Sequence, residues 1–234
     1  MVTKGAHPGR YDCGVTVDMA VFTMRGGRFE ILLVERGKPP FKGRLALPGG
    51  FLEPDEDLDQ AARRELVEET GLSAARVHLE QFRGYGAPGR DPRARVITMS
   101  YLALVPGPPP AVAGGDAAGV RWVPVTEVED VTVELAFDHH RIAVEAAEHA
   151  RTKLEYTTVA TAFCEPEFTV ADLRRVYEAV WGTRLDPRNF HRKVSGIAGF
   201  LVPTGTTTAR DGGRPAALYR AGTATTLRPP LYRG

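Results

Sequence analysis

The sequence predicts a mixed α/β domain over residues 1–150, followed by a winged helix-turn-helix domain over residues 151–234. Three observations support this prediction. Strand and helix periodicities mix along the first part, a compact run of glutamates follows a glycine pair, and two short helices precede a hairpin near the end. The charge divides the chain in the same way. Residues 1–150 hold 17 Lys and Arg against 22 Asp and Glu, and residues 151–234 hold 13 against 7, so net charges of −5 and +6 indicate two modules with different partners.

Apolar residues in the first module recur at the spacing of several strands and one helix. Strands are expected at residues 11–24, 29–35, 44–47, 77–83, 96–105 and 120–125. Gly26 and Gly27 are typical of a tight turn, so the first two strands should pair as a hairpin. The helix should begin at Leu58 and end at Gly71, because glycine commonly terminates helices. The proline- and glycine-rich residues 106–115 predict a loop.

Helical spacing from residue 137 to about residue 156 predicts a helix that bridges the two modules. Thr169, with Asp172 three residues later, forms a capping-box pattern that should start the next helix. Asp186 and Pro187 should open another helix, with the aspartate as the cap and the proline in the first turn. Short strands are expected at residues 200–203 and 216–220, around a polar loop.

Composition excludes several classes of protein. With 43% hydrophobic and 25% charged residues, the chain has the make-up of an ordinary globular protein. No apolar run approaches the roughly 20 residues of a membrane span, and the polar start has no signal-peptide core, so we expect a cytoplasmic protein with no membrane partner. Cys13 and Cys164 are far apart and belong to no Cys/His motif, so we expect two small buried residues rather than a metal site.

One segment carries the strongest signal for chemistry: Gly50-x5-Glu56-x7-Arg64-Glu65-Leu66-x-Glu68-Glu69-x-Gly71-Leu72. On a helix, Glu65, Glu68 and Glu69 share one face, where like charges repel. A hard cation such as Mg²⁺ removes that repulsion, because it binds oxygen ligands. A solvated acidic helix face is the alternative. A chance match to the whole pattern is on the order of one in a billion per starting position at ordinary residue frequencies, which argues against that alternative.

This segment resembles the Nudix box at every fixed position. The resemblance implies the Nudix α/β/α sandwich and a substrate built as a nucleoside diphosphate linked to a second group. It implies a Mg²⁺ or Mn²⁺ site with five donors: Glu65, Glu68 and Glu69, completed by Glu56 and the Gly50 carbonyl. Arg64 would orient a glutamate, and the metal would polarise the pyrophosphate and activate water. In members that act on ADP-ribose the general base often lies outside the box, where the candidates are Glu127, Glu129, Asp130 and Glu134.

Residues 89–93 (GRDPR), just before the strand at 96–105, carry a second local resemblance. They are similar to a loop of Nudix proteins that handle ADP-ribose and of a related group of regulators. The resemblance implies ligand binding by Arg90, Asp91 and Arg93, with the arginines contacting phosphate or ribose. A bare turn with exposed charges is the alternative.

Two helices joined by a short turn and followed by a hairpin make up residues 169–219, an arrangement typical of a winged helix-turn-helix. The second helix would be the recognition helix. Its polar residues suit contacts with the phosphates and base edges of double-stranded DNA: Arg188, Asn189, His191, Arg192 and Lys193. Arg210 and Arg214 in the hairpin loop would reach the minor groove or the backbone. The alternative is a small helical appendage used for dimerisation or for covering the active site.

Four further stretches extend the resemblance over the chain beyond residue 10: residues 137–139, 155–156, 186–193 and 213–216. With the box, they resemble the Nudix-related transcriptional regulators of NAD metabolism, the NrtR type. That family implies a homodimer that binds a palindromic operator, represses NAD biosynthesis or salvage genes, and releases DNA when ADP-ribose or a related nucleotide binds the Nudix domain. Many members have degraded boxes, whereas this box is whole. A Mg²⁺-dependent ADP-ribose pyrophosphatase, alone or combined with regulation, is therefore the alternative function.

Overall fold

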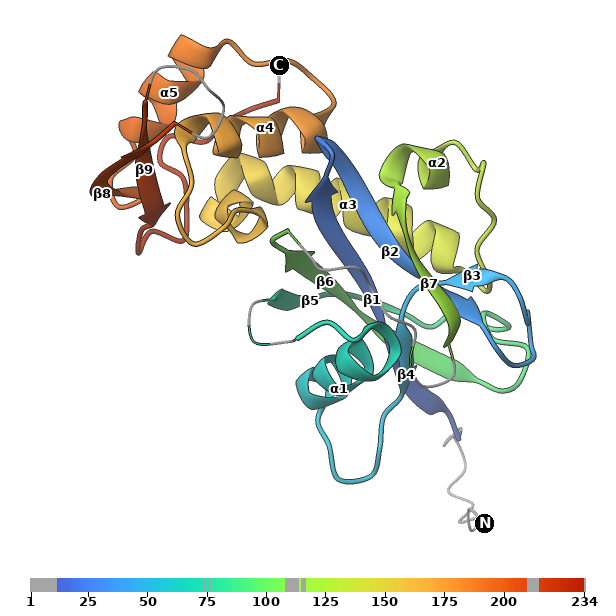
Figure 1. Ribbon diagram of the computed structural model, residues 1–234. Helices are drawn as coiled ribbons and strands as arrows, with labels where there is room; N and C mark the ends of the chain where they lie inside the picture. Colours follow the sequence, from blue (N-terminus) through green and yellow to red (C-terminus); the bar gives the residue numbers. More distant parts are fainter. Residues whose placement is uncertain are drawn as a thin grey trace.

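The computed structural model describes residues 12–73, 75, 77–107, 114, 117–209 and 215–233. Within these residues, the central feature is a seven-stranded mixed sheet (Figure 1). Its strands are β1 (Gly14–Arg25), β2 (Arg28–Arg36), β3 (Leu45–Ala46), β4 (Gly49–Phe51), β5 (His78–Tyr85), β6 (Val96–Val105) and β7 (Ala117–Pro124). The strand order is β3-β2-β1-β6-β5, with β4 paired to β1 and β7 paired to β2. The β1–β6 pair is parallel and the other pairs are antiparallel.

Helices cover both faces of the sheet and make an α/β/α sandwich (Figure 1). The helices are α1 (Leu58–Thr70), α2 (Val125–Glu129), α3 (His139–Tyr156), the 3-10 helix η2 (Thr158–Phe163), α4 (Val170–Trp181) and α5 (Pro187–Ser195). Alternation along β1 sends Val17 and Met19 toward α1, and Ala20 and Phe22 toward α3. Because both faces are covered, β1 is buried at every position from Thr16 to Thr23 rather than at alternate ones.

The first hairpin and α1 form for local reasons that the sequence predicts. Gly26 and Gly27 adopt φ values of 54° and 75°, as a tight two-residue hairpin turn requires. Asp57 caps α1 through a capping box with Gln60, and Gly71 ends the helix with a left-handed φ of 67°. These boundaries fix which residues of α1 face the sheet and which face solvent.

The C-terminal module contains α4, α5 and a hairpin of β8 (Leu201–Thr208) and β9 (Ala216–Ala221). The capping boxes and caps predicted for Thr169 and Asp186 are both present. Tyr177 of α4 packs against Phe190 of α5, with ring centroids 5.3 Å apart, so the two helices are held as a helix-turn-helix. Arg210 and Arg214, predicted to contact DNA from the hairpin loop, lie outside the described residues.

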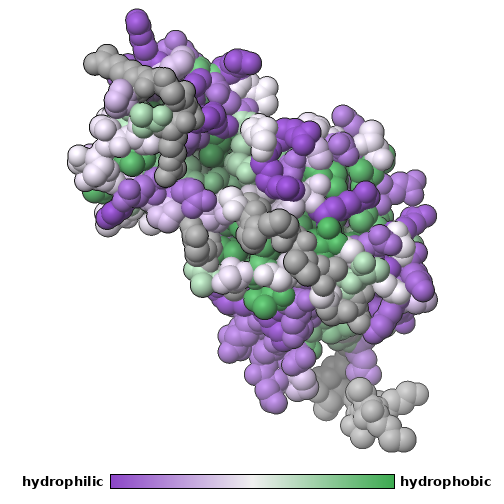
Figure 2. Space-filling model, viewed as in Figure 1, coloured by the Kyte–Doolittle hydropathy of each residue, from purple (hydrophilic) through white to green (hydrophobic). Residues whose placement is uncertain are grey.

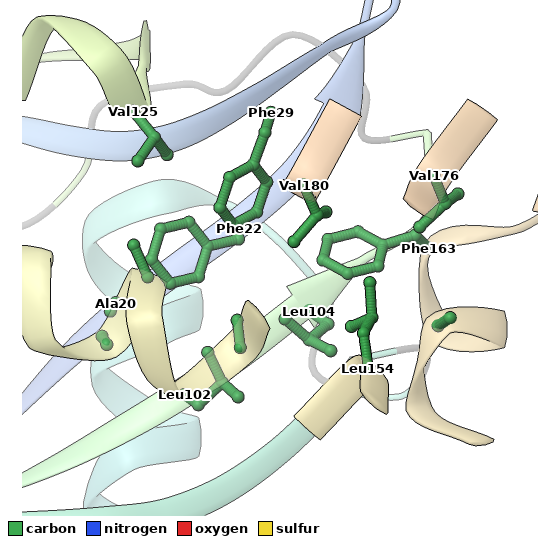
Figure 3. Packing of buried hydrophobic residues seen from close by; sticks show 14 of the residues in the cluster. Ala20, Phe22, Phe29, Leu102, Leu104, Val125, Leu154, Phe163, Val176 and Val180 are labelled. Carbon is green, nitrogen blue, oxygen red and sulfur yellow. The ribbon is translucent and has the colours of Figure 1, made fainter. Parts of the chain in front are cut away.

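The two modules share one hydrophobic core (Figure 3). Phe22 and Phe29 of the sheet stack with ring centroids 4.7 Å apart, and Phe29 meets Phe163 of η2 edge to face at 6.0 Å. Val176 and Val180 of α4 join the same cluster. A boundary drawn after residue 150 falls inside α3, in the middle of this core. The modules are therefore packed together rather than joined by a linker.

Four elements were not expected from the sequence: β4, α2, η2 and a C-terminal segment, residues 222–233, that runs back along α3. In this segment the amide of Leu227 donates to the carbonyl of Tyr156 at 2.8 Å, and the amide of Leu231 donates to Glu155 at 2.9 Å. Both leucine side chains are buried. The segment thus fastens the end of the chain to the bridging helix.

Two smaller expectations have different outcomes. Cys13 is exposed, so the expectation that both cysteines are buried is wrong, and Cys164 is partly buried. Most of the predicted loop at 106–115 lies outside the described residues. No helix within the described ranges is long and apolar enough to cross a membrane.

Candidate functional site

A cavity of about 430 Å³ lies among β1, β4, α1, the 89–93 loop and the start of α3. This volume is within the range of about 300–1,000 Å³ that small-molecule sites occupy. Its polar and aromatic lining residues are Thr16, Asp18, Glu35, Arg36, Lys38, Phe51, Glu65, Glu68, Glu69, Arg90, Asp91, Arg93, Phe137 and His139, with Gly49 and Gly50 contributing backbone. The box glutamates and the 89–93 loop, far apart in sequence, therefore meet at one cavity.

The three box glutamates differ in burial. Glu65 is buried, Glu69 is partly buried and Glu68 is exposed. The backbone amide of Gly49 donates a hydrogen bond to Glu69 Oε2 at 2.9 Å, which holds that carboxylate against β4. At Gly50, a Cβ atom would collide with the Glu65 carboxylate. Glycine at this position is what allows the carboxylate to approach the strand.

Arg64 organises the acidic cluster from outside the cavity. Its guanidinium binds both oxygens of Glu56, with Nη2–Oε1 at 2.6 Å and Nε–Oε2 at 3.0 Å. Its Nη1 reaches Glu65 at 2.7 Å and Glu68 at 3.1 Å. The hydrogen bond from Arg64 lowers the pKa of Glu56, and the glutamates raise the pKa of Arg64. Arg64 thus orients glutamates, as predicted for the box, but Glu56 faces Arg64 and does not line the cavity.

Burial disfavours the charged forms of two box glutamates, Glu65 and Glu69. Desolvation raises the pKa of Glu65, and it raises the pKa of Glu69 to about 7, helped by repulsion from Glu65 and Asp18. A cluster of oxygen donors that resists ionisation suits a hard divalent cation, which stabilises the ionised forms. Among the described residues, however, no three Asp, Glu, His or Cys side chains are arranged to hold a metal ion. The donor chemistry fits a cation, and the side chains would have to converge on it.

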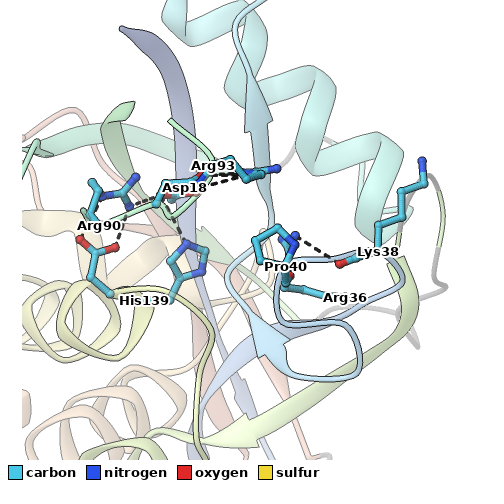
Figure 4. A network of polar contacts seen from close by, with 9 residues as sticks. Asp18, Arg36, Lys38, Pro40, Arg90, Arg93 and His139 are labelled. Atoms are coloured by element: carbon cyan, nitrogen blue, oxygen red, sulfur yellow. Dashed lines mark hydrogen bonds and ion pairs between the residues drawn. The ribbon is translucent and has the colours of Figure 1, made fainter. Parts of the chain in front are cut away.

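A buried ion-pair network forms another part of the cavity wall (Figure 4). Arg90 is only 5% exposed and pairs with Asp138 at 2.7 Å and with Asp18 at 3.1 Å. His139 accepts the Leu47 amide on Nδ1 at 2.9 Å, so the neutral ring carries its proton on Nε2, 3.6 Å from Asp18. Burial lowers the pKa of His139. The network therefore joins β1, the 89–93 loop and the start of α3.

Arginines and aromatic rings alternate along the rim of the cavity. The Asp91 carboxylate accepts three hydrogen bonds from the Arg93 guanidinium, the shortest at 2.6 Å. The Arg93 guanidinium lies 5.4 Å from the Phe51 ring centroid and 5.6 Å from that of Phe137. Arg36 stacks on Phe137 at 4.7 Å. Flat faces beside cations suit a nucleotide base and its phosphates.

Sequence reasoning missed several of these lining residues: Asp18, Arg36, Lys38, Phe51, Phe137 and His139. Two signals were available: Phe51 directly follows Gly49 and Gly50, and residues 137–139 belong to a stretch that resembles the regulator family. The sequence also left four candidates for the general base. None of Glu127, Glu129, Asp130 and Glu134 lines the cavity. Glu129 instead pairs with Arg151, and Glu134 is exposed with Arg44 3.7 Å away.

The recognition helix predicted from the sequence is α5, and its apolar residues point inward. Phe190 and Val194 are buried against α4. All five predicted DNA-binding residues of this helix are exposed: Arg188, Asn189, His191, Arg192 and Lys193. Arg192 Nη2 donates to Asn189 Oδ1 at 2.7 Å, one turn apart on the same face. On the Nudix domain, hydrophilic residues are likewise exposed on α1 and on the acidic loop before it, residues 53–57 (Figure 2). Arg184, in the turn before α5, is a further exposed cation that was not predicted.

The comparisons with known proteins agree with this division into two modules. A NUDIX domain matches residues 14–145, and an NrtR DNA-binding winged helix domain matches residues 161–221. The ADPR responsive transcriptional repressor NtrR of Acinetobacter baylyi is 35% identical over 208 residues, which cover 88% of this chain and 81% of that repressor. The chain belongs to the NrtR family. Both the Nudix resemblance and the regulator resemblance seen in the sequence are confirmed.

Solved structures of the NrtR family match either the whole fold or its Nudix domain. Shewanella oneidensis NrtR complexed with a 27mer DNA has a TM-score of 0.77 and 31% identity, covering 93% of this chain and 99% of that one. The NUDIX domain of Shewanella oneidensis NrtR complexed with ADP ribose has a TM-score of 0.55 and 31% identity, covering 62% of this chain and 94% of that one. The predicted Nudix sandwich with a C-terminal winged helix-turn-helix is thus confirmed.

Proposed function

We propose that this protein is a DNA-binding transcriptional repressor that releases its operator when ADP-ribose or a related nucleotide occupies the Nudix cavity. One observation carries the proposal: Phe137 and His139, at the start of α3, line the cavity, and the last turns of α3 pack against the helix-turn-helix. A ligand that moves the start of this helix also moves the DNA-binding module. The relatives support both halves, because one is an ADPR responsive repressor and the NrtR structures contain DNA or ADP ribose.

On the DNA side, α5 inserts its exposed polar residues into the major groove. Arg188, Arg192 and Lys193 contact phosphates or guanines, and Asn189 and His191 contact base edges. The protein acts as a homodimer on a palindromic operator, with half-sites one or two helical turns apart. The genes it represses serve NAD biosynthesis or salvage, and this role places it in the cytoplasm. Arg210 and Arg214 of the hairpin loop would add contacts to the minor groove or backbone.

On the ligand side, the acidic and basic residues of the cavity contact different parts of the nucleotide. Glu65, Glu68, Glu69 and the Gly50 carbonyl would hold Mg²⁺ or Mn²⁺, and Glu56 would join them only after leaving Arg64. The cation would neutralise the pyrophosphate when bound. Arg90 and Arg93 donate to phosphate or ribose oxygens, with Asp91 fixing Arg93. Phe51 offers an exposed ring face for the base.

A gel shift on the protein's own upstream region tests the proposal. We expect a retarded complex without nucleotide, and its loss when ADP-ribose and Mg²⁺ are added. AMP and ribose 5-phosphate, the two halves of the ligand, serve as controls that should leave the complex intact. A chain that binds no upstream DNA, or whose complex ignores ADP-ribose, would refute the proposal.

The complete Nudix box favours a second activity, Mg²⁺-dependent hydrolysis of ADP-ribose to AMP and ribose 5-phosphate. Glu65, Glu68, Glu69 and Arg64 would form the catalytic cluster, and three of these line the cavity. Hydrolysis would remove the ligand and restore repression. Steady-state assays with Mg²⁺ or Mn²⁺ decide this. Turnover no higher than that of the Glu68→Gln, Glu69→Gln double variant would exclude the activity.

A further inference from the structure

Asp138 occupies the N-cap position of α3, yet its side chain makes no capping hydrogen bond. At the starts of α1, α4 and α5, the cap side chains of Asp57, Thr169 and Asp186 each accept a hydrogen bond from a backbone amide three residues later. The ψ values of these three residues are 174°, 160° and 122°. Asp138 has a ψ of 17° instead. Cap residues ordinarily have extended backbone, so this aspartate is held away from the geometry that its position favours.

The group that holds Asp138 is Arg90. Asp138 Oδ2 accepts from Arg90 Nε at 3.0 Å, and Oδ1 accepts from Nη2 at 2.7 Å. Arg90 lines the cavity, and within the described part of the chain its Nη1 group has no hydrogen-bond acceptor. Phosphate oxygens match the planar guanidinium in the same two-point manner as a carboxylate does. A phosphate in the cavity therefore competes directly with Asp138 for Arg90.

The residue before Asp138 has an unusual backbone conformation while Asp138 is paired with Arg90. Phe137 adopts a φ of 55°, in the left-handed region that a bulky residue rarely enters. Its ring lines the cavity, packed by Arg36 and Arg93. Turning Asp138 into a capping geometry changes the dihedrals at this junction, so the release of Asp138 and the movement of Phe137 are coupled.

We propose that Asp138 is the positioning residue that reports ligand occupancy to the DNA-binding module; this deepens the proposed function and rests on it. Paired with Arg90, Asp138 keeps the start of α3 in the arrangement that binds DNA. A ligand phosphate draws Arg90 away, and the freed carboxylate caps α3 and reorients its first turn. At the far end, Arg151 Nε donates to Val180 at 3.0 Å, and Trp181 Nε1 donates to Arg151 at 3.2 Å, so α4 follows α3.

Uncharged cap residues at position 138 test this mechanism, because they can still cap α3 but cannot form an ion pair with Arg90. Asp138→Asn and Asp138→Ser are made in the full chain, with Glu145→Gln as the matched control. Glu145 lies on the same helix, α3, and pairs with Arg83 of β5 and with Arg141 of α3. It does not line the cavity. Titration calorimetry gives the affinity for ADP-ribose with Mg²⁺, and fluorescence anisotropy gives the affinity for upstream DNA with and without the nucleotide.

Both Asp138 variants should bind ADP-ribose about fivefold more tightly, and DNA more weakly without ligand, so that added ADP-ribose changes DNA affinity little. Glu145→Gln should match the wild type in all three measurements. A purely structural role for Asp138 would lower the melting temperature and leave ADP-ribose affinity unchanged. The proposal is overturned if a folded Asp138 variant binds ADP-ribose with wild-type affinity and if ADP-ribose still weakens its DNA binding as much as in the wild type. A wild type that ignores ADP-ribose on DNA refutes the proposed function instead, and the calorimetric comparison still tests the competition for Arg90.

Discussion

Arg151 of α3 donates a hydrogen bond from Nε to the carbonyl oxygen of Val180, 3.0 Å away in the last turn of α4. The same guanidinium pairs with Glu129 of α2, and the Arg151 carbonyl accepts the indole N–H of Trp181. One partly buried side chain thus ties the bridging helix to both the Nudix domain and the helix-turn-helix. Because α3 donates a hydrogen bond to α4 and α4 donates one to α3, the two helices are expected to move together.

Replacing Arg151 with methionine should destabilise the protein and loosen this connection. The substitution leaves Glu129 without its partner and the Val180 carbonyl without a donor, so the free energy of unfolding should fall by about 2 kcal/mol. Urea unfolding measures the change. Arg141→Met removes an exposed arginine from the same helix and should cost much less stability, because exposed ion pairs contribute little. Equal losses in the two variants would contradict the role given to Arg151.

Two cations on the exposed face of α5 should contribute to DNA affinity through phosphates. Arg192→Ala and Lys193→Ala should each weaken binding to the operator and reduce the slope of log affinity against log salt by about one. Anisotropy titrations over a range of salt concentrations give both quantities. Arg141→Ala, outside the winged module, should leave the slope unchanged. If both α5 variants keep wild-type affinity and slope, α5 is not the recognition helix.

Gly50→Ala should damage the ligand site with little effect on the fold. The added methyl group would collide with the Glu65 carboxylate and push it away from β4. We expect affinity for ADP-ribose in Mg²⁺ to fall about tenfold or more, as changes around metal sites commonly cause. Calorimetry measures the loss. Gly119→Ala, whose methyl group would make only van der Waals contact with Glu35, is the matched control. Wild-type affinity for the nucleotide in Gly50→Ala would show that Glu65 does not act there.

Acid should weaken the contact between β5 and α3 through Glu80. Burial raises the pKa of this carboxyl, but His78 and Lys153, whose Nζ lies 2.6 Å away, outweigh burial and lower the pKa to about 2. A folded-state pKa below the unfolded value stabilises the protein above about pH 5, and this stability is lost as pH falls toward 2. The contribution is roughly 2 kcal/mol, since the side chain is 22% exposed.

The measurement for Glu80 is urea unfolding at pH 3 and pH 7, for the wild type and for Glu80→Gln. The wild type should lose more stability than the variant between these two values, because glutamine has no proton to gain. Parallel losses in the two proteins would show that Glu80 carries no pH-dependent stability. Other carboxylates titrate in both proteins, so only the difference between the two losses is interpreted.

Features encoded by neighbouring residues could be predicted from the sequence. Gly26 and Gly27 dictate their own turn, Asp57 and Gln60 cap α1, and Thr169 caps α4, so these boundaries agree with prediction. The glutamate face of α1 follows from helical geometry alone. The fold class follows from the order of such elements.

Features that depend on contacts between distant residues could not be predicted. The pairing of Arg90 with Asp138 spans 48 residues, and the parallel pairing of β1 with β6 brings together strands that are about 80 residues apart. No local pattern shows that Phe137 lines the same cavity as Phe51. Likewise, Leu227 and Leu231 form no periodic pattern, and only the packing against α3 explains their burial.

The proposed regulation is tested most sharply by asking whether ADP-ribose and operator DNA oppose each other's binding by the same factor. Thermodynamic linkage requires that the fold by which ADP-ribose weakens DNA binding equals the fold by which DNA weakens ADP-ribose binding. Anisotropy gives the first factor, and calorimetry on the free protein and on its operator complex gives the second. We predict equal factors of about tenfold or more, within the usual range of coupling between sites. Equal affinity for ADP-ribose with and without operator would show that the nucleotide does not regulate DNA binding.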